Sequence, residues 1–366
     1  MHTSGKSIHP RTPFPNSPAS IRPASTPMYH LLHIGCLIAL LLPLCTYAEE
    51  HPPKSSKKID HLLQKLLPPS RMDSTYAMRD SFRFILKPKI TVSFGEYSFR
   101  QEESDKDETF SLQSDPIVKI GINFTYRNLT LSLQTSTDKI TGRANGEEVE
   151  YGIQSHGNRL GGELLYSTSA NYTLHDAHNR ELLPDLRCFK SQRLHAAGYY
   201  VFNHRRFAYP CTITQSYYQK QSCGSLIASL TAGHRILDMD QNRIPENSDL
   251  AGLLSIIPRE IRYTHAALGI GYAYNWIPHP RWTLHGSLQA SVPLYEHGKI
   301  TTAESHESIK WKPYNLDYHV RIGALWSHRR YFSGLYVLFN AHRIQFKAID
   351  ISDLYFRSRI YFGMRF

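Results

Sequence analysis

The closing stretch of the sequence, Ile360-Tyr361-Phe362-Gly363-Met364-Arg365-Phe366, decides the fold class. Apolar residues fall on every second position of this stretch, which is the side-chain period of a β-strand. A final strand that stops on an aromatic residue resembles the signal read by the machinery that assembles barrels in the outer membrane. We therefore predict a barrel-assembly signal on the outer face of a last strand. Its residues are Ile360, Phe362, Met364 and Phe366.

The same two-residue period recurs upstream of the closing stretch. Apolar and polar residues alternate over 120–126, 129–134, 284–292 and 320–326. Each stretch approaches the roughly 9–11 residues that a tilted strand needs to cross a bilayer. The pattern predicts an all-β fold, a transmembrane antiparallel up-and-down β-barrel. About thirteen strands can be counted, with 253–257 as a further short one; because such barrels have an even number, we expect about 12, with 14 as the alternative.

The connections between these stretches alternate in length. Short turns are expected at 127–128, 157–158, 203–206, 278–280 and 328–330. Long polar segments are expected over about 98–116, 138–150, 168–192, 234–261 and 295–315. Short periplasmic turns and long external loops are typical of outer-membrane barrels. Aromatic residues gather beside the short turns, which favours an interfacial girdle, although aromatic residues are common in strands generally.

The N-terminal part has the layout of a secretory signal peptide. An apolar run over 31–44 precedes Thr46-Tyr47-Ala48, which places small residues at the −3 and −1 positions of a cleavage site. Met28 is a candidate for the true start, because no acidic residue precedes it. The predicted organisation is a signal peptide over 1–48, a periplasmic extension over 49–81 and an outer-membrane β-barrel over 82–366.

The formal net charge of +11 raises the question of a nucleic-acid partner. The basic residues are scattered among the predicted strands without a binding motif, so none is expected. Of five cysteines, two leave with the signal peptide, and Cys188, Cys211 and Cys223 remain. Cys211 and Cys223 flank a predicted loop and could form a disulfide, while free thiols are an equally good interpretation.

One region has a distinctive order of residues. It runs through Gly198-Tyr199-Tyr200-Val201-Phe202-Asn203, Phe207-Ala208-Tyr209-Pro210 and Gln219-Lys220-Gln221-Ser222-Cys223-Gly224-Ser225. With Gly269-Ile270-Gly271-Tyr272 and the closing strand, this region resembles the DUF4421 family, a Bacteroidetes family of uncharacterised outer-membrane proteins. The similarity covers about 90–366. It implies an outer-membrane barrel and brings no known activity.

If the closing strand turns its apolar residues outward, the alternate residues face the barrel lumen. The same alternation applies to the other strands. The lumen-facing candidates are Lys119, His285, Gln289, Arg321, Arg357, Arg359 and Tyr361. A basic wall favours anions in an open pore. Alternatively, these groups pair with acidic partners inside a plugged barrel.

No residue pattern predicts catalysis or a metal site. His285 and Ser287 share a strand face, as in outer-membrane lipid A deacylases, but ordinary lumen polarity explains them equally well. The 175–178 segment has two histidines, and 238–249 resembles a calcium loop without its glycine. Solvated loops account for both segments better than metal binding does. We therefore expect no catalytic residue, no metal and no cofactor.

Three functional classes remain after these exclusions. The leading one is a pore or transport barrel for small polar solutes. The others are a structural or assembly partner in the cell envelope and an outer-membrane lipid-modifying enzyme, an acyl hydrolase of lipid A or phospholipid. The expected location is the outer membrane of a Gram-negative bacterium. The expected partners are outer-membrane lipid, the barrel assembly machinery and envelope proteins that the sequence does not identify.

Overall fold

The computed structural model describes residues 61, 71–101, 109–141, 147–176, 189–239, 259–301, 306–308, 316–345 and 349–366. The predicted signal peptide, most of the predicted 49–81 extension and the 253–257 segment lie outside these ranges. None of the helices in the described ranges has the length and apolar character needed to cross a membrane.

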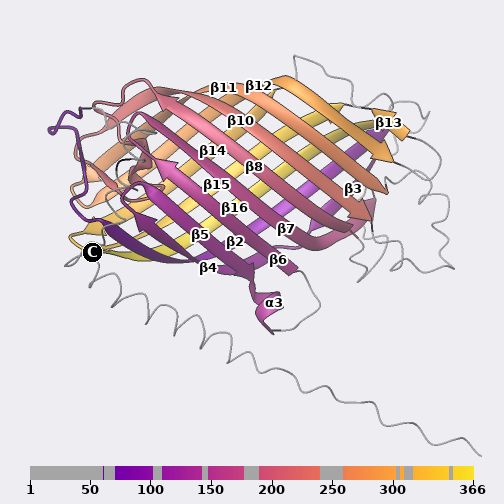
Figure 1. The fold of residues 1–366 in the computed structure, drawn as a ribbon, viewed down its shortest axis with the longest axis horizontal. Coiled ribbons are helices and arrows are strands. Elements are labelled where there is room, and N and C mark those ends of the chain that lie inside the picture. Colours follow the sequence, from indigo (N-terminus) through magenta and orange to yellow (C-terminus); the bar gives the residue numbers. More distant parts are fainter. Residues whose placement is uncertain are drawn as a thin grey trace, which may run out of the picture.

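The described strands form one closed barrel (Figure 1). Its sheet has 14 strands, of which β3 and β13 are short additions, so twelve make up the ring. In chain order these twelve are β2 (Phe84–Gln101), β4 (Ile117–Tyr126), β5 (Leu129–Ser136), β6 (Glu147–His156), β7 (Leu160–Asp176), β8 (Phe189–Val201), β10 (Cys223–Met239), β11 (Glu260–His279), β12 (Trp282–Thr301), β14 (Asp317–His328), β15 (Tyr331–Gln345) and β16 (Ile349–Arg365). Each pairs antiparallel with the next, and β16 pairs with β2 to close the ring. The predicted up-and-down barrel of 12 strands is confirmed.

Closure explains why this arrangement suits a membrane. Lipid offers no hydrogen bonds, so every strand edge has to be paired within the protein. The closing pair of β2 and β16 meets this need over most of its length, from Ile85 opposite Arg365 to Gln101 opposite Ile349.

Smaller elements extend the ring at its two ends. They are β1 (Ala77–Arg79), β3 (Thr109–Ser114), α3 (Thr137–Thr141), η1 (Tyr209–Cys211), β9 (Tyr217–Gln219) and β13 (His306–Ser308). Strand β3 joins β2 to β7 beyond the ends of β4, β5 and β6. Strands β1 and β9 form a separate two-stranded sheet, which becomes important below.

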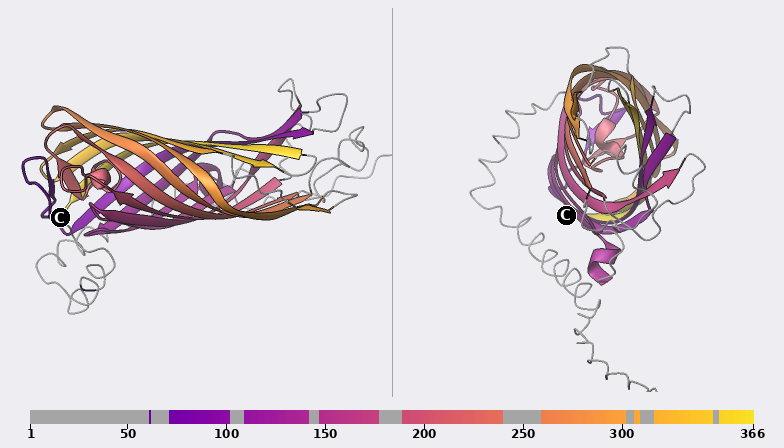
Figure 2. Two further views of the ribbon diagram at one scale, coloured as in Figure 1. Left: turned by 90° about the horizontal axis from the view of Figure 1, so that it is seen from above. Right: turned by 90° about the vertical axis from the view of Figure 1, so that its right-hand side faces the viewer.

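Tight turns lie at the end of the barrel where the chain terminates, and the long connections lie at the other end (Figures 1 and 2). The turns after β4, β6, β11 and β14 fall within two residues of the predicted positions. Arg127 (φ 54°) and Arg329 (φ 48°) adopt the left-handed conformation that two-residue hairpins require. By the usual topology of these barrels, the end with tight turns is the periplasmic one.

The fifth predicted turn, at 203–206, is longer than predicted. Strand β8 ends at Val201 and β10 begins only at Cys223. A turn does form at the rim, where the amide of Phe207 donates to the carbonyl of Asn203 at 2.9 Å. The chain then enters the barrel instead of continuing into the wall, and we call residues 207–219 the plug. Figure 2 shows this segment inside the tight-turn end of the barrel.

The strands also run further at the external end than predicted. Strands β11 and β12 each have 20 residues, about twice the 9–11 that a tilted strand needs to cross the bilayer. Parts of the predicted loops 168–192, 234–261 and 295–315 are therefore strand. The wall extends well beyond the hydrocarbon core on the external side.

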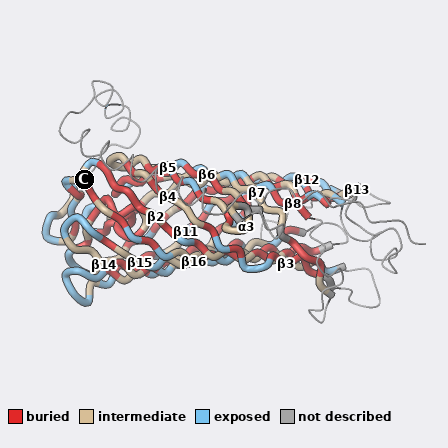
Figure 3. Tube along the Cα trace, turned by 90° about the horizontal axis from the view of Figure 1, so that it is seen from below, coloured by how far each residue is buried: buried red, intermediate tan, exposed pale blue. Residues whose placement is uncertain are grey.

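Burial along the strands is the reverse of that in a water-soluble protein (Figure 3). Outward side chains are apolar and exposed, as in Ile270 (60%), Ile322 (58%) and Ile360 (64%). Inward side chains are polar and buried, as in Lys119 and Asn275, both at 0%. An apolar belt around a polar interior is what a bilayer selects, because lipid replaces the missing apolar contacts. Exposed aromatic residues near the tight turns are Phe202, Tyr274, Trp276, Trp282 and Tyr331.

Candidate functional site

The plug is attached to the barrel wall by polar contacts. Lys87 on β2 donates through Nζ to the carbonyl of Ile213 and to Oε1 of Gln215, both at 2.8 Å. Asn275 on β11 donates to the carbonyl of Ala208 at 3.1 Å. Gln215 adopts a left-handed conformation (φ 59°), so the chain reverses at the point where the wall contacts it. These contacts fix the plug without making it part of the wall.

The N-terminal segment holds the plug from the periplasmic side. Strand β1 pairs with β9, so that Met78 lies opposite Tyr218. Asp80, just after β1, forms an ion pair with Arg365 of β16 at 2.8 Å. Burial raises the pKa of Asp80, and the nearby Arg365 guanidinium acts in the opposite direction. The plug is therefore held between the barrel wall and the N-terminal segment that contains β1.

Apolar side chains seal the same end. Phe207 and Tyr209 of the plug pack with Val201, Ile227 and Ala273 of the wall. A second cluster joins wall, plug and β1; its buried members are Ala77, Ile85, Ala208, Cys211, Tyr217, Leu325, Phe332 and Tyr361. These two clusters fill the tight-turn end of the lumen around the plug with packed apolar side chains.

A chamber lies on the external side of the plug. The chamber has a cavity volume of about 90 Å³. Tyr209 of the plug lines it, and so do side chains from several strands. Its charged lining residues, histidines apart, are Arg193, Arg321, Arg357, Arg359, Glu150 and Glu163. Positive charge therefore exceeds negative charge in the lining.

A layer of paired side chains lies further toward the external end. Arg235 on β10 forms an ion pair with Asp353 on β16 and donates to the Tyr97 hydroxyl of β2 at 3.4 Å. His342 on β15 hydrogen-bonds Asp317 on β14. Two smaller cavities border this layer, and both share Arg193 with the central chamber. The layer narrows the lumen on the external side of the chamber.

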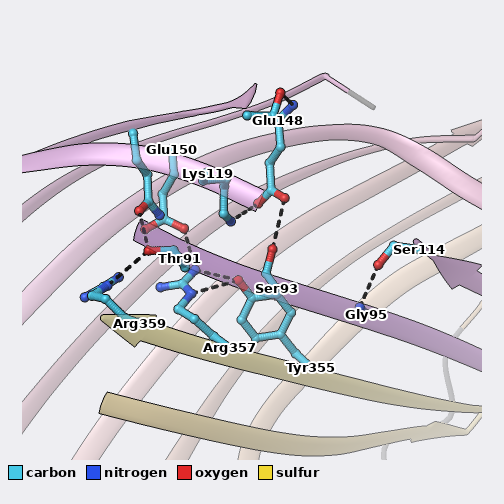
Figure 4. Close-up of polar contacts among 12 residues, drawn as sticks. Thr91, Ser93, Gly95, Ser114, Lys119, Glu148, Glu150, Tyr355, Arg357 and Arg359 are labelled. Carbon is cyan, nitrogen blue, oxygen red and sulfur yellow. Dashed lines mark hydrogen bonds and ion pairs between the residues drawn. The ribbon is translucent and has the colours of Figure 1, made fainter. Parts of the chain in front are cut away.

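Beside the chamber, charged groups are paired along one part of the wall (Figure 4). Lys119 on β4 contacts Glu148 on β6 at 2.6 Å. Arg357 on β16 pairs with Glu150 on β6 and donates from Nε to the Tyr355 hydroxyl at 2.9 Å. Figure 4 shows these side chains pointing toward one another from β4, β6 and β16. Their charges are largely neutralised within the protein.

All seven predicted lumen candidates lie on the inner face of the wall, in three groups. Gln289, Arg321, Arg357 and Arg359 line the chamber. Lys119 belongs to the paired group beside it. His285 and Tyr361 lie against the plug: the His285 ring is 5.7 Å from the Tyr209 ring, and the Tyr361 hydroxyl accepts from Gln215 at 3.2 Å.

The closing residues divide between two environments. Ile360 and Phe362 (52%) are exposed on the outer face. Phe366 lies in the same outward series but is only 4% exposed, because it packs with Phe84 and Leu86. Met364 is partly buried against the same cluster. The closing aromatic residue thus seals the seam between the first and last barrel strands. Recognition by the assembly machinery stays a prediction.

Sequence reasoning missed several residues of the chamber. Arg193 was not found because its surroundings were assigned to a loop, and Tyr209 because the plug has no two-residue period. The tyrosine had a signal of another kind, since it belongs to the Phe207-Ala208-Tyr209-Pro210 segment that carried the family resemblance.

The remaining candidates from the sequence are the His285 and Ser287 pair, the cysteines and the two segments with possible metal ligands. His285 donates from Nδ1 to Oδ1 of Asn275 at 2.7 Å, and Ser287 Oγ has no partner among the described residues. Cys211 and Cys223 are free thiols. No group of three potential metal ligands occurs in the described part of the chain. The 178 and 240–249 positions lie outside it.

A family model described as "Domain of unknown function (DUF4421)" matches residues 71–366. The chain belongs to the DUF4421 family. The match spans the N-terminal segment with β1, the plug and the whole DUF4421 barrel. A comparison with curated proteins gives no significant match.

Solved barrels align with this DUF4421 protein at low similarity. The translocator domain of the autotransporter NalP from Neisseria meningitidis is 10% identical, with a TM-score of 0.35, over 88% of this chain and 98% of that one. The COG4313 outer membrane channel from Pseudomonas putida F1 is 11% identical, with a TM-score of 0.33, over 81% and 100%. The P. putida toluene transporter TodX is 7% identical, with a TM-score of 0.29, over 78% and 90%. The barrel architecture of this DUF4421 protein is established by the pairing of its own strands and not by these low similarities.

Proposed function

We propose that this DUF4421 protein is an outer-membrane transport barrel for small polar solutes and that the plug is its gate. The apolar outer belt and polar interior support a place in the outer membrane, reached through the predicted signal peptide and the barrel assembly machinery. The lumen is too small and too occupied in the closed state for free diffusion. Passage therefore requires movement of the plug.

The observation that carries this proposal is that the closure does not belong to the wall. The β8–β10 pairing begins at Val201 opposite Ile227 and includes no residue of the plug. Each hydrogen bond between plug and wall contributes about 1 kcal/mol, or roughly 1.5–3 where a charged group such as Lys87 takes part. Such contacts can be exchanged for contacts with water, whereas opening the wall breaks a continuous ladder in lipid.

Solute flux into proteoliposomes tests this proposal. In the test variant a two-residue Gly-Ser linker replaces residues 205–221, which removes the plug and keeps the β8–β10 pairing. We expect slow entry of small sugars and amino acids through the native protein and at least tenfold faster entry through the plugless variant. The Gln192→Ala variant, at an exposed outward position of β8, is the matched control and should behave as the native protein.

Folding of each variant is checked by the shift in gel mobility between boiled and unboiled samples. A plugless barrel that folds and admits no solute contradicts the proposal. That outcome favours a structural role in the envelope, for which the Arg235–Asp353 pair across the lumen is the supporting observation. Under that role the protein should co-purify with a stable envelope partner.

A further inference from the structure

The chamber contains three arginines that form no ion pair with any described residue. Arg193 on β8, Arg321 on β14 and Arg359 on β16 all line it. Within the described residues, none of the three lies within 4.0 Å of a carboxylate oxygen. By contrast, Arg357 in the same lining pairs with Glu150, and Arg235, further toward the external end, pairs with Asp353.

The two carboxylates of the chamber lining do not balance the positive charge of its arginines. Glu150 is engaged by Arg357, which leaves Glu163, 4.0 Å from the ring of His195, as the one carboxylate of the lining that faces the three arginines. Arg193, Arg321 and Arg359 are half-buried around the chamber, where their charges are screened less than in bulk water. With one remaining carboxylate among three like charges, a bound anion is expected to reduce the repulsion between them.

The contacts that these arginines do make leave most of their donors available. Arg359 donates from Nε to Thr91 at 3.4 Å, and Arg321 donates to the Tyr209 hydroxyl. The Arg193 guanidinium lies over the Tyr355 ring at 4.9 Å. Each guanidinium has five N–H donors in a planar fork that matches a carboxylate or phosphate.

We infer that the chamber is a binding site for a small solute bearing a carboxylate or phosphate group, held by Arg193, Arg321 and Arg359. This inference rests on the proposed transport function and names its substrate class. Ser229 Oγ, buried in the lining with no hydrogen-bond partner among the described residues, is a further donor for the same oxygens. The volume is on the order of six water molecules. This favours a solute of several heavy atoms over a halide ion.

The site lies behind the plug, which gives a way to control access. Tyr209 contributes both to the apolar seal and, through its hydroxyl, to the environment of Arg321. Movement of the plug therefore opens the chamber and removes one of its polar contacts at the same time. A solute bound to the three arginines could then leave toward the periplasm.

Isothermal titration calorimetry of the full-length protein in detergent, with the plugless barrel measured alongside, tests the site directly. Inorganic phosphate and succinate are the two probes, so that the two oxyanion sources are distinguished. We expect saturable binding of at least one probe and at least tenfold weaker binding in Arg321→Gln. Arg262→Gln, which changes an exposed arginine paired with Glu260 on β11, is the control and should bind like the parent.

A second measurement separates this inference from the transport proposal. The reversal potential of the plugless barrel in a KCl gradient is compared with that of a triple variant, Arg193→Gln, Arg321→Gln and Arg359→Gln. Loss of anion preference in a variant that still conducts supports the site. Unchanged anion preference, or equal probe binding by the parent and Arg321→Gln, overturns the site while leaving transport intact. Absence of conductance from both barrels contradicts transport itself, and probe binding then decides the site alone.

Discussion

Arg235 on β10 and Asp353 on β16 form an ion pair across the lumen. Along the ring, β16 is reached from β10 through β11, β12, β14 and β15, which is five steps in a barrel of twelve strands. Six steps would be diametrically opposite, so the pair connects nearly opposite walls. Both side chains are almost fully buried, and together with Tyr97 they narrow the lumen on the external side of the chamber.

Breaking this pair on one side should destabilise the barrel. We expect Arg235→Met to lower the free energy of unfolding by about 3–5 kcal/mol, because it leaves the Asp353 carboxylate buried without compensation. The double variant Arg235→Met, Asp353→Leu should recover most of that loss, since it removes both charges. Urea unfolding of vesicle-inserted protein, followed by tryptophan fluorescence, measures these two variants and the single variant Asp353→Leu. A double variant as unstable as the sum of the two single variants would show that the two groups do not interact.

Cys211 should report movement of the plug. Its thiol is buried, and burial raises its pKa, so the reactive thiolate is scarce and shielded in the closed state. In a Cys188→Ala, Cys223→Ala background, which leaves Cys211 as the single thiol of the predicted mature chain, we expect maleimide to label the protein slowly. Lys87→Met keeps the length of the side chain but removes two hydrogen bonds to the plug. Labelling should then accelerate about tenfold or more.

Gln192→Ala again serves as the control for the labelling experiment, and its rate should equal that of the Cys188→Ala, Cys223→Ala parent. Equal rates for Lys87→Met and the parent would mean that the polar contacts do not hold the plug in place.

Lowering the pH should weaken the contact between Asp73 and Thr75 in the N-terminal segment. Hydrogen bonds from Thr75, together with the nearby Arg206, lower the pKa of Asp73 below its ordinary 3.8. A lowered pKa means that the contact contributes above pH 3.8 and is lost as the pH falls through the folded-state value. Amide hydrogen exchange at Thr75 should therefore accelerate below that value. In Asp73→Asn this pH step should disappear, and its persistence would assign the step to another group.

The outer face should tolerate charge poorly once the protein is in lipid. Ile322 is exposed near the middle of β14, where Ile322→Arg is expected to cost about 2–4 kcal/mol in vesicles. Met78 is also exposed, but it lies on β1 outside the wall, so Met78→Arg should have little effect. Equal unfolding free energies for the two variants in vesicles would mean that β14 does not face lipid.

Most of the fold could be predicted from the alternation of apolar and polar residues along the strands. Stretches such as 120–126 and 284–292 cross the lipid, where every outward residue must be apolar, so their strands were predicted. Beyond the lipid that requirement ends while the strand continues: His297 and Lys299 are outward residues of β12 and polar. The external ends of β8, β10 and β12 were therefore assigned to loops, and the loop predicted over 168–192 ended just before Arg193.

The plug could not be predicted from local pattern for a different reason. Residues such as Phe207 and Tyr209 are buried because of what surrounds them in the closed barrel, and an irregular segment leaves no periodic trace. The lumen candidates were easier, since alternation alone gives their direction. Alternation does not reveal which charges are paired, and Arg357 and Arg359 differ in this respect although they are neighbours on one strand face.

Single-channel recording in planar bilayers tests the central claim most directly. The claim is that a polar lumen is closed at its periplasmic end by a movable plug. We predict that the native protein shows little or brief current and that the plugless barrel shows discrete, long-lived steps with a preference for anions. A folded plugless barrel without current, or a native protein that conducts as freely as the plugless one, would contradict it.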